Sequence, residues 1–190
     1  MFSGVYEKLE RATYFLNNLK TMADDAGGFP YVKKSQELRA NLDGFFFEII
    51  SAKDFFLQGV NDKYGAGLSK QEGADLGKLL PLLRGSNNKA YNVVIQIQRL
   101  LSQTTSWLWI VNNYRNSATH RELIHFGHEA KFPDNVVRAQ VPPENLKTYL
   151  FKDPEDSSQG NSVIEVIPYC EQSLEQMRTF LDGLYSQLGI

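Results

Sequence analysis

The sequence predicts a mainly α-helical bundle with a small two-stranded β-hairpin inserted before the last helix. Apolar residues recur at steps of three and four along most of the 190-residue chain, which is the spacing of one face of an α-helix. Two short segments, 136–141 and 162–167, instead alternate and are rich in branched residues, as in strands. The length suits one domain with its own core. We therefore expect a single helical domain over residues 1–190, with the hairpin insertion at 136–167.

The first two expected helices cover residues 2–20 and about 32–61. Between them, the segment 24–30 contains two adjacent glycines and a proline, which favour a loop. The apolar residues of the second helix extend well beyond one face. That distribution is typical of a central helix, or of one that meets a partner subunit.

Glu48 stands alone in the apolar run FFFEII at 45–50 of the second helix. An unpaired charge is costly in such surroundings. Two interpretations remain open. Glu48 either reaches the surface between the aromatic side chains, or it is a buried acid that holds Arg115 or orients His120.

The segment 62–86 is glycine-rich, and we expect an irregular connection with one short helical turn near its leucines. Its Gly-Ala-Gly does not match a nucleotide-binding loop, because the third glycine and the following Gly-Lys-Ser/Thr are absent. The third helix is expected over about 87–114. Near its end, Trp107 and Trp109 are interpreted as anchors in the core or in an interface.

The two expected strands are joined by a long polar loop, and the last helix follows at about 168–188. This helix shows the most regular apolar spacing in the chain. Its seam alternates strictly between steps of four and three, and consists of Cys170, Leu174, Met177, Leu181, Leu184 and Leu188.

The segment at 114–121, Tyr-Arg-Asn-Ser-Ala-Thr-His-Arg, places a cation, an amide and an imidazole close together. In an unbroken helix, the five-residue spacing would turn Arg115 and His120 about 140° apart. Asn116 and the following serine compete with helical backbone bonding, and Thr119 with Glu122 resembles a capping box. We therefore expect the helix to break here and a new helix to run to Pro133. An Arg fork beside a helix start suits a phosphate.

The pattern Arg-Asn-x-x-x-His, formed by Arg115, Asn116 and His120 late in a helical domain, resembles the signature of the HEPN superfamily. The surrounding helices resemble that family too, although only the motif is specific. The resemblance implies an HEPN-like up-and-down helical bundle. Many members of the family are metal-independent endoribonucleases of toxin–antitoxin and phage-defence systems, whereas others are inactive or serve as scaffolds. Related enzymes place two motifs face to face across a homodimer, and we expect the same here.

One segment of the chain carries only positive charges. The net charge is −2, but residues 76–121 contain no Asp or Glu. Their six basic residues attract a phosphate backbone if they gather on one surface, but form no patch if they are scattered around a helix. They are Lys78, Arg84, Lys89, Arg99, Arg115 and Arg121.

No cofactor or metal is expected. His120, His125 and His128 lie within nine residues, but the only nearby carboxylates are Glu122 and Glu129, and no cysteine is near. We favour satisfied or surface histidines over a metal site.

We also expect a cytoplasmic protein without a membrane segment. The chain has one cysteine and no basic-then-apolar leader. Its apolar runs also fall short of the ~20 residues that a bilayer requires.

The chemistry expected of the motif is RNA cleavage by attack of the 2′-hydroxyl on the phosphate. His120 suits proton transfer near neutral pH, and Arg115 suits the phosphate charge. Asn116 would bind the phosphate or hold His120 in one tautomer. Tyr114, Thr119, Arg121 and Glu48 are candidate supporting residues. By analogy with the family, the product would be a 2′,3′-cyclic phosphate, and the partners would be RNA, a second copy and, for a toxin, an antitoxin protein.

Two alternatives to this chemistry remain open. In the first, Arg115 and His120 form a purely structural pair that ties helix ends together. In the second, the chain is a non-catalytic helical module that binds a nucleotide, a nucleic acid or a protein partner. The near-neutral net charge and the lack of any other catalytic set favour this second hypothesis.

Overall fold

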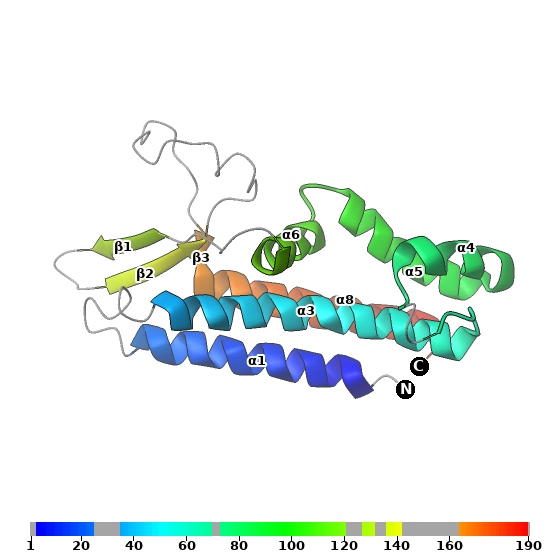
Figure 1. Cartoon of the computed structure of the whole chain (residues 1–190), viewed down its shortest axis with the longest axis horizontal. Helices are drawn as coiled ribbons and strands as arrows, with labels where there is room; N and C mark the ends of the chain where they lie inside the picture. Colours follow the sequence, from blue (N-terminus) through cyan, green and yellow to red (C-terminus); the bar gives the residue numbers. More distant parts are fainter. Residues whose placement is uncertain are drawn as a thin grey trace.

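A computed structural model of the chain describes residues 3–24, 35–69, 73–120, 127–131, 136–141 and 164–189. These residues are mainly helical, which confirms the predicted class, and they pack as a helical bundle with a small sheet at one end (Figure 1). Within them, no helix combines the length and the apolar character needed to cross a membrane. The helices are α1 Ser3–Asp24, α3 Ser35–Tyr64, α4 Leu76–Ser86, α5 Asn88–Ser102, α6 Trp107–His120 and α8 Val166–Leu188.

The helices α1 and α3 run in opposite directions and form the most extensive helix pair (Figure 1). Their register is fixed by glycines that each lie under a phenylalanine of the other helix. A Cβ added at Gly4 would lie 2.4 Å from the Phe55 ring, and one at Gly44 would lie 2.6 Å from the Phe15 ring. One contact lies at the start of α1 and the other near its middle, so a slip of either helix along the other would lose both.

A buried polar group lies in the same interface. Asn41 is 7% exposed, accepts a hydrogen bond from Asn18 on α1 at 3.0 Å, and donates to the Glu37 carbonyl at 2.8 Å. Because a buried amide is costly without partners, this pair adds to the specificity of the register. Residues 25–30 of the expected loop between these helices lie outside the described residues.

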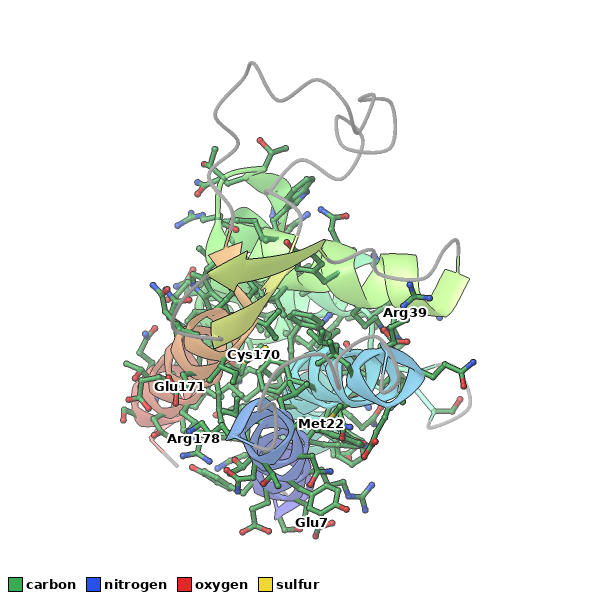
Figure 2. All side chains as sticks on the ribbon, turned by 90° about the vertical axis from the view of Figure 1, so that its left-hand side faces the viewer. Glu7, Met22, Arg39, Cys170, Glu171 and Arg178 are labelled. Atoms are coloured by element: carbon green, nitrogen blue, oxygen red, sulfur yellow. The ribbon has the colours of Figure 1, made fainter. Side chains whose placement is uncertain are left out.

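The helix α8 packs behind α3 in the view of Figure 1 and confirms the last predicted helix. All six residues of its predicted seam are buried. Figure 2 looks along the bundle, with α1, α3 and α8 seen nearly end-on and Cys170 pointing into the core between them. Burial raises the pKa of the Cys170 thiol well above its usual range, so this thiol is an unreactive core group.

The side chain of Asn61 stabilises the connection that follows α3. Asn61 is 3% exposed, and its amide oxygen accepts from the Leu68 amide at 3.1 Å while its nitrogen donates to the Leu68 carbonyl at 2.9 Å. Gly65 and Gly67 have φ angles of 65° and 85°, which side chains with a Cβ rarely adopt. The glycines therefore permit a tight loop that Asn61 closes.

The expected short turn near the leucines is a helix of eleven residues, α4. Asp75 caps it by accepting a hydrogen bond from the Lys78 amide at 2.9 Å, and Leu79, Leu80 and Leu83 bury one face. Capping and burial together support this helix despite Pro81 in its interior.

The prediction of one helix over 87–114 is wrong, because the chain breaks between α5 and α6. Residues 103–106 form a turn, and the Ser106 hydroxyl accepts a hydrogen bond from the Trp109 amide at 3.1 Å. This is an N-terminal cap, which serine makes well. The apolar spacing continued through Thr104 and so concealed the polar run that starts the new helix.

The β-structure is a three-stranded antiparallel sheet in the order β1-β2-β3, formed by β1 Gly127–Lys131, β2 Val136–Val141 and β3 Ile164–Glu165. It differs from the expected two-stranded hairpin in two ways. The main partner of β2 is β1, in a segment where a helix up to Pro133 was predicted, so that prediction is wrong for residues 127–131. In the second expected strand, 162–167, residues 164–165 form β3 and α8 begins at Val166, whereas residues 162–163 lie outside the described part of the chain.

Candidate functional site

The candidate motif lies on the last turns of α6, which runs without interruption from Trp107 to His120. The predicted break between Arg115 and His120 is therefore wrong. In a continuous helix, positions five residues apart are separated by about 140° around the axis and do not share a face. One reason the helix continues is that the amide oxygen of Asn116 accepts from Arg115 Nη1 at 3.1 Å, so this side chain is occupied away from the backbone.

Tyr114 anchors this part of α6 in the core. It is 1% exposed, and its ring stacks on that of Phe46 with centroids 4.9 Å apart and an interplanar angle of 15°. The ring of Tyr169 on α8 meets the Tyr114 ring edge-on at 5.8 Å. Tyr114 thus joins three helices, and its contribution to the candidate site is to fix where α6 crosses α3.

Arg115 lies at the edge of that crossing, half-buried. Its guanidinium carbon is 5.9 Å from the centroid of the Phe47 ring on α3. Phe47 is 40% exposed, so the cation–aromatic pair lies at the surface of the bundle. The aromatic ring and Asn116 together hold the guanidinium in a defined position, which is a condition for binding a phosphate by its fork of N–H groups.

Glu48 is buried, in agreement with the second of the two interpretations. Its ion pair, however, is with Lys8 on α1. Its Oε2 lies 2.8 Å from Lys8 Nζ, with side-chain exposures of 10% and 13% for the two residues. The Lys8 ammonium also lies 5.5 Å from the centroids of both Phe47 and Phe55. Glu48 therefore fixes a lysine between two exposed phenylalanines beside the crossing, a role that sequence spacing could not reveal.

Five residues singled out in the sequence lie wholly or partly outside the described part of the chain. The backbone of Thr119 and His120 belongs to α6, but their side chains are not among those described, and Arg121 lies outside the described residues. His125 and the side chain of His128 also lie outside the described residues. Among the residues that the structure describes, no three potential ligands gather around a metal position. The expectation that no metal binds stays a prediction.

The described cations of residues 76–121 lie on three helices, α4, α5 and α6. Lys78 pairs with the Asp75 carboxylate at 3.2 Å, and Lys89 donates to the Leu188 carbonyl at the end of α8 at 3.1 Å. On α5, Lys89 and Arg99 are separated by ten residues, or about 15 Å along the helix. The cations are thus spread over separate helix ends, and the described side chain that combines positive charge with the motif is Arg115.

Asp43 is a titratable group near the crossing that the sequence did not single out. It lies on α3 one helical turn before Phe47, and therefore on the same side of that helix. Burial raises the pKa of the Asp43 carboxyl, and the positive charge of Arg39 partly opposes the rise. Figure 2 shows Arg39 on the side of α3 toward α6.

A shallow pocket of about 440 Å³ lies at the other end of the exposed α3 face. It is lined by Asp54, Phe55, Gln58, Gly73, Ala74 and Asp75. Its two carboxylates already have partners, because Asp54 pairs with Lys53 at 2.9 Å and Asp75 caps α4. The pocket is separate from the motif and contains no residue predicted to be functional.

Comparison with known proteins leaves the family open: no family model, no curated protein and no solved structure matches the chain.

Proposed function

We propose that the protein is an HEPN-like, metal-independent endoribonuclease whose reactive site is shared between two copies of the chain. The observation that supports this proposal most is the placement of Arg115. Its guanidinium is held at the bundle surface by Asn116 and by the Phe47 ring, at the point where α6 crosses α3. A fixed guanidinium at a surface edge suits recognition of a phosphate in an RNA backbone.

The site requires two copies of the chain because α6 is continuous through the motif. Arg115 and His120 occupy positions about 140° apart around one continuous helix, so we do not expect both to reach one phosphate within a single chain. In a dimer, Arg115 of one copy would meet His120 of the other. The imidazole would take the 2′-hydroxyl proton, and the guanidinium would stabilise the charge that develops on the phosphate oxygens. As the 2′-oxygen bonds to phosphorus, the bond from phosphorus to the 5′-oxygen would break, and this oxygen would take a proton from the imidazolium or from water. The products would be a 2′,3′-cyclic phosphate and a 5′-hydroxyl.

The proposal is tested by incubating the purified protein with single-stranded and structured RNA in the presence of a chelator. Cleavage is expected from the wild type and is expected to be lost in both Arg115→Ala and His120→Ala. Arg84→Ala is a matched control, because it removes an exposed cation of the same segment on α4. Equal cleavage by the wild type and His120→Ala would exclude the assignment.

The second candidate function is a non-catalytic helical module that binds a nucleotide, a nucleic acid or a protein partner. The unbroken α6 favours it, because positions 115 and 120 of a continuous helix do not share a face. On this reading, RNA or nucleotide binding depends on Arg115 while no product forms. Binding measured by fluorescence anisotropy on the samples of the cleavage assay separates the two candidates.

A further inference from the structure

The ring of Phe47 contacts two cations that come from different helices. The Lys8 ammonium on α1 is 5.5 Å from the ring centroid, and the guanidinium carbon of Arg115 on α6 is 5.9 Å from it. Both distances fall within the ~6 Å over which the quadrupole of an aromatic ring attracts a cation. Phe47 itself belongs to α3, so its ring connects α1 to the arginine of the candidate motif.

The Lys8 ammonium is fixed by groups of α3. Its Nζ lies 2.8 Å from Glu48 Oε2, and the side chains of Lys8 and Glu48 are only 13% and 10% exposed. The centroid of the Phe55 ring is also 5.5 Å from this ammonium. The Phe55 ring is in turn packed on the backbone of Gly4, where an added Cβ would lie 2.4 Å from it. A lysine ordinarily keeps much rotamer freedom, whereas here the ammonium has one defined place beside Phe47.

The Glu48 carboxylate allows the ammonium to remain in this place. A largely buried lysine is costly without an opposite charge, and its long side chain would otherwise turn toward water. Glu48 directly follows Phe47 in the chain, so carboxylate and ring hold the same ammonium from adjacent positions of α3. Because the carboxylate neutralises Lys8, this lysine attracts an anion only weakly and acts on the ring by its position.

The position of the Arg115 guanidinium depends in turn on the Phe47 ring. Asn116 Oδ1 contacts the guanidinium at 3.1 Å from the same helix, and the ring supplies a contact from another helix. An arginine side chain carries about 2 kcal/mol of rotamer entropy, so a guanidinium that is already fixed loses less freedom when it binds a phosphate. A change that frees the ring should therefore weaken anion binding at Arg115 without touching the anion.

We propose that Lys8 and Glu48 are positioning residues for Arg115, because their ion pair holds the Phe47 ring where it contacts the guanidinium. In this arrangement Glu48 acts on Arg115 through Lys8 and the ring rather than by direct contact. The helix α1 thereby joins α3 and α6 in building the candidate site. For the identity of the anion as an RNA phosphate, the inference rests on the proposed function.

The coupling is tested without RNA by the NMR resonance of the Arg115 Nε–H group, which is identified by its absence in Arg115→Ala. The double variant Lys8→Met/Glu48→Gln removes both charges and so leaves no buried carboxylate unpaired. It should shift the Arg115 resonance, as Phe47→Leu should, because the ring moves or is lost beside the guanidinium. The matched control is Lys20→Met, which removes an exposed ion pair of the same helix and should leave the resonance in place.

RNA binding tests the consequence, with a fluorescein-labelled single-stranded RNA that is 2′-O-methylated and therefore cannot be cleaved. Fluorescence anisotropy should show about 2- to 5-fold weaker binding for Lys8→Met/Glu48→Gln and for Phe47→Leu, as for the loss of one exposed cation–aromatic contact. Phe47→Trp should bind like the wild type, because tryptophan makes the strongest contact of this kind. In an Arg115→Ala background, the double variant should have no further effect.

An Arg115 resonance that does not move in the double variant would overturn the inference. An equal loss of RNA binding with and without Arg115 would overturn it as well, because the ion pair would then act through general stability or through its own contact with RNA. Circular dichroism verifies the fold of each variant, and Lys8→Gln, which keeps a hydrogen-bond donor for the carboxylate, replaces a double variant that does not fold. Failure of the proposed function looks different: the Arg115 resonance responds to Lys8 as expected, but the wild type does not cleave RNA.

Discussion

Replacing Gly44 by alanine should destabilise the protein, although alanine is the better helix former. In the interior of α3, the change gains about 1 kcal/mol from helix propensity. The added methyl group, however, would lie 2.6–2.8 Å from three atoms of the Phe15 ring, too close for any non-bonded contact. The ring is partly buried against the core, so it must move and give up its packing. Overpacking of this kind costs about 1–3 kcal/mol, which equals or exceeds the propensity gain.

Gly183→Ala is the matched control. Gly183 lies in the interior of α8, and a Cβ added there meets nothing within 4 Å. This variant should gain about 1 kcal/mol from helix propensity alone. The free energies of unfolding of the two variants should therefore differ by about 1–3 kcal/mol, which urea denaturation followed by circular dichroism resolves.

A second variant identifies the cause of the loss at Gly44. If the clash with Phe15 is responsible, shortening the ring in Gly44→Ala/Phe15→Leu should cost less than the two single changes added together. If Gly44→Ala is as stable as Gly183→Ala, the Phe15 ring does not lie over Gly44.

Three further outcomes follow from particular contacts. Lys8→Met should lower the free energy of unfolding by about 3 kcal/mol, because it leaves a buried carboxylate unpaired. Lys20→Met should lower it by at most about 1 kcal/mol, because its ion pair is exposed. Equal losses would contradict the burial of the Lys8–Glu48 pair. Asn61→Ala should cost about 1–3 kcal/mol in urea unfolding, because both backbone groups of Leu68 lose their partner, and an unchanged midpoint would refute this role. The hydrogen bond from the Lys78 amide lowers the pKa of the Asp75 carboxyl. The stability contributed by this hydrogen bond is therefore present above the usual pKa of 3.8 and is lost as the pH falls through the lower pKa of the folded state. Asp75→Asn keeps the cap but should lack this acid-dependent loss of stability in thermal melts across that pH range.

Much of the bundle could be predicted because its elements are encoded locally. The seam of α8 shows strict spacing from Cys170 to Leu188, and every member of it is buried. The broad apolar girth of the second predicted helix correctly indicated a central position, since α3 contacts α1, α6 and α8. Where one face of a helix packs against a single core, the periodicity of apolar residues is sufficient to predict the helix and its buried face.

The errors arose where short-range signals compete. The spacing that ran through Thr104 concealed the cap at Ser106, so α5 and α6 were predicted as one helix. Two polar residues after Arg115 then suggested a break that the structure does not contain. The strand β1 has the sequence Gly-His-Glu-Ala-Lys, without alternation or branched residues, and its pairing with β2 gives it extended structure.

The surroundings of the site depend on contacts that sequence spacing cannot show. Glu48 was recognised as unusual, but its partner Lys8 lies 40 positions earlier on another helix. Likewise, nothing near Arg115 in the chain indicates that Phe47 lies beneath its guanidinium. These are tertiary juxtapositions, and they give the candidate site its position on the bundle.

A ribonuclease site shared by two chains can be tested by mixing two inactive variants. Arg115→Ala and His120→Ala, equilibrated in equal amounts, form mixed dimers in which one of the two shared sites has both functional residues. Neither variant should cleave RNA alone, and the mixture should recover about one quarter of the wild-type rate. A mixture as inactive as its components, beside an active wild type, would contradict the shared site.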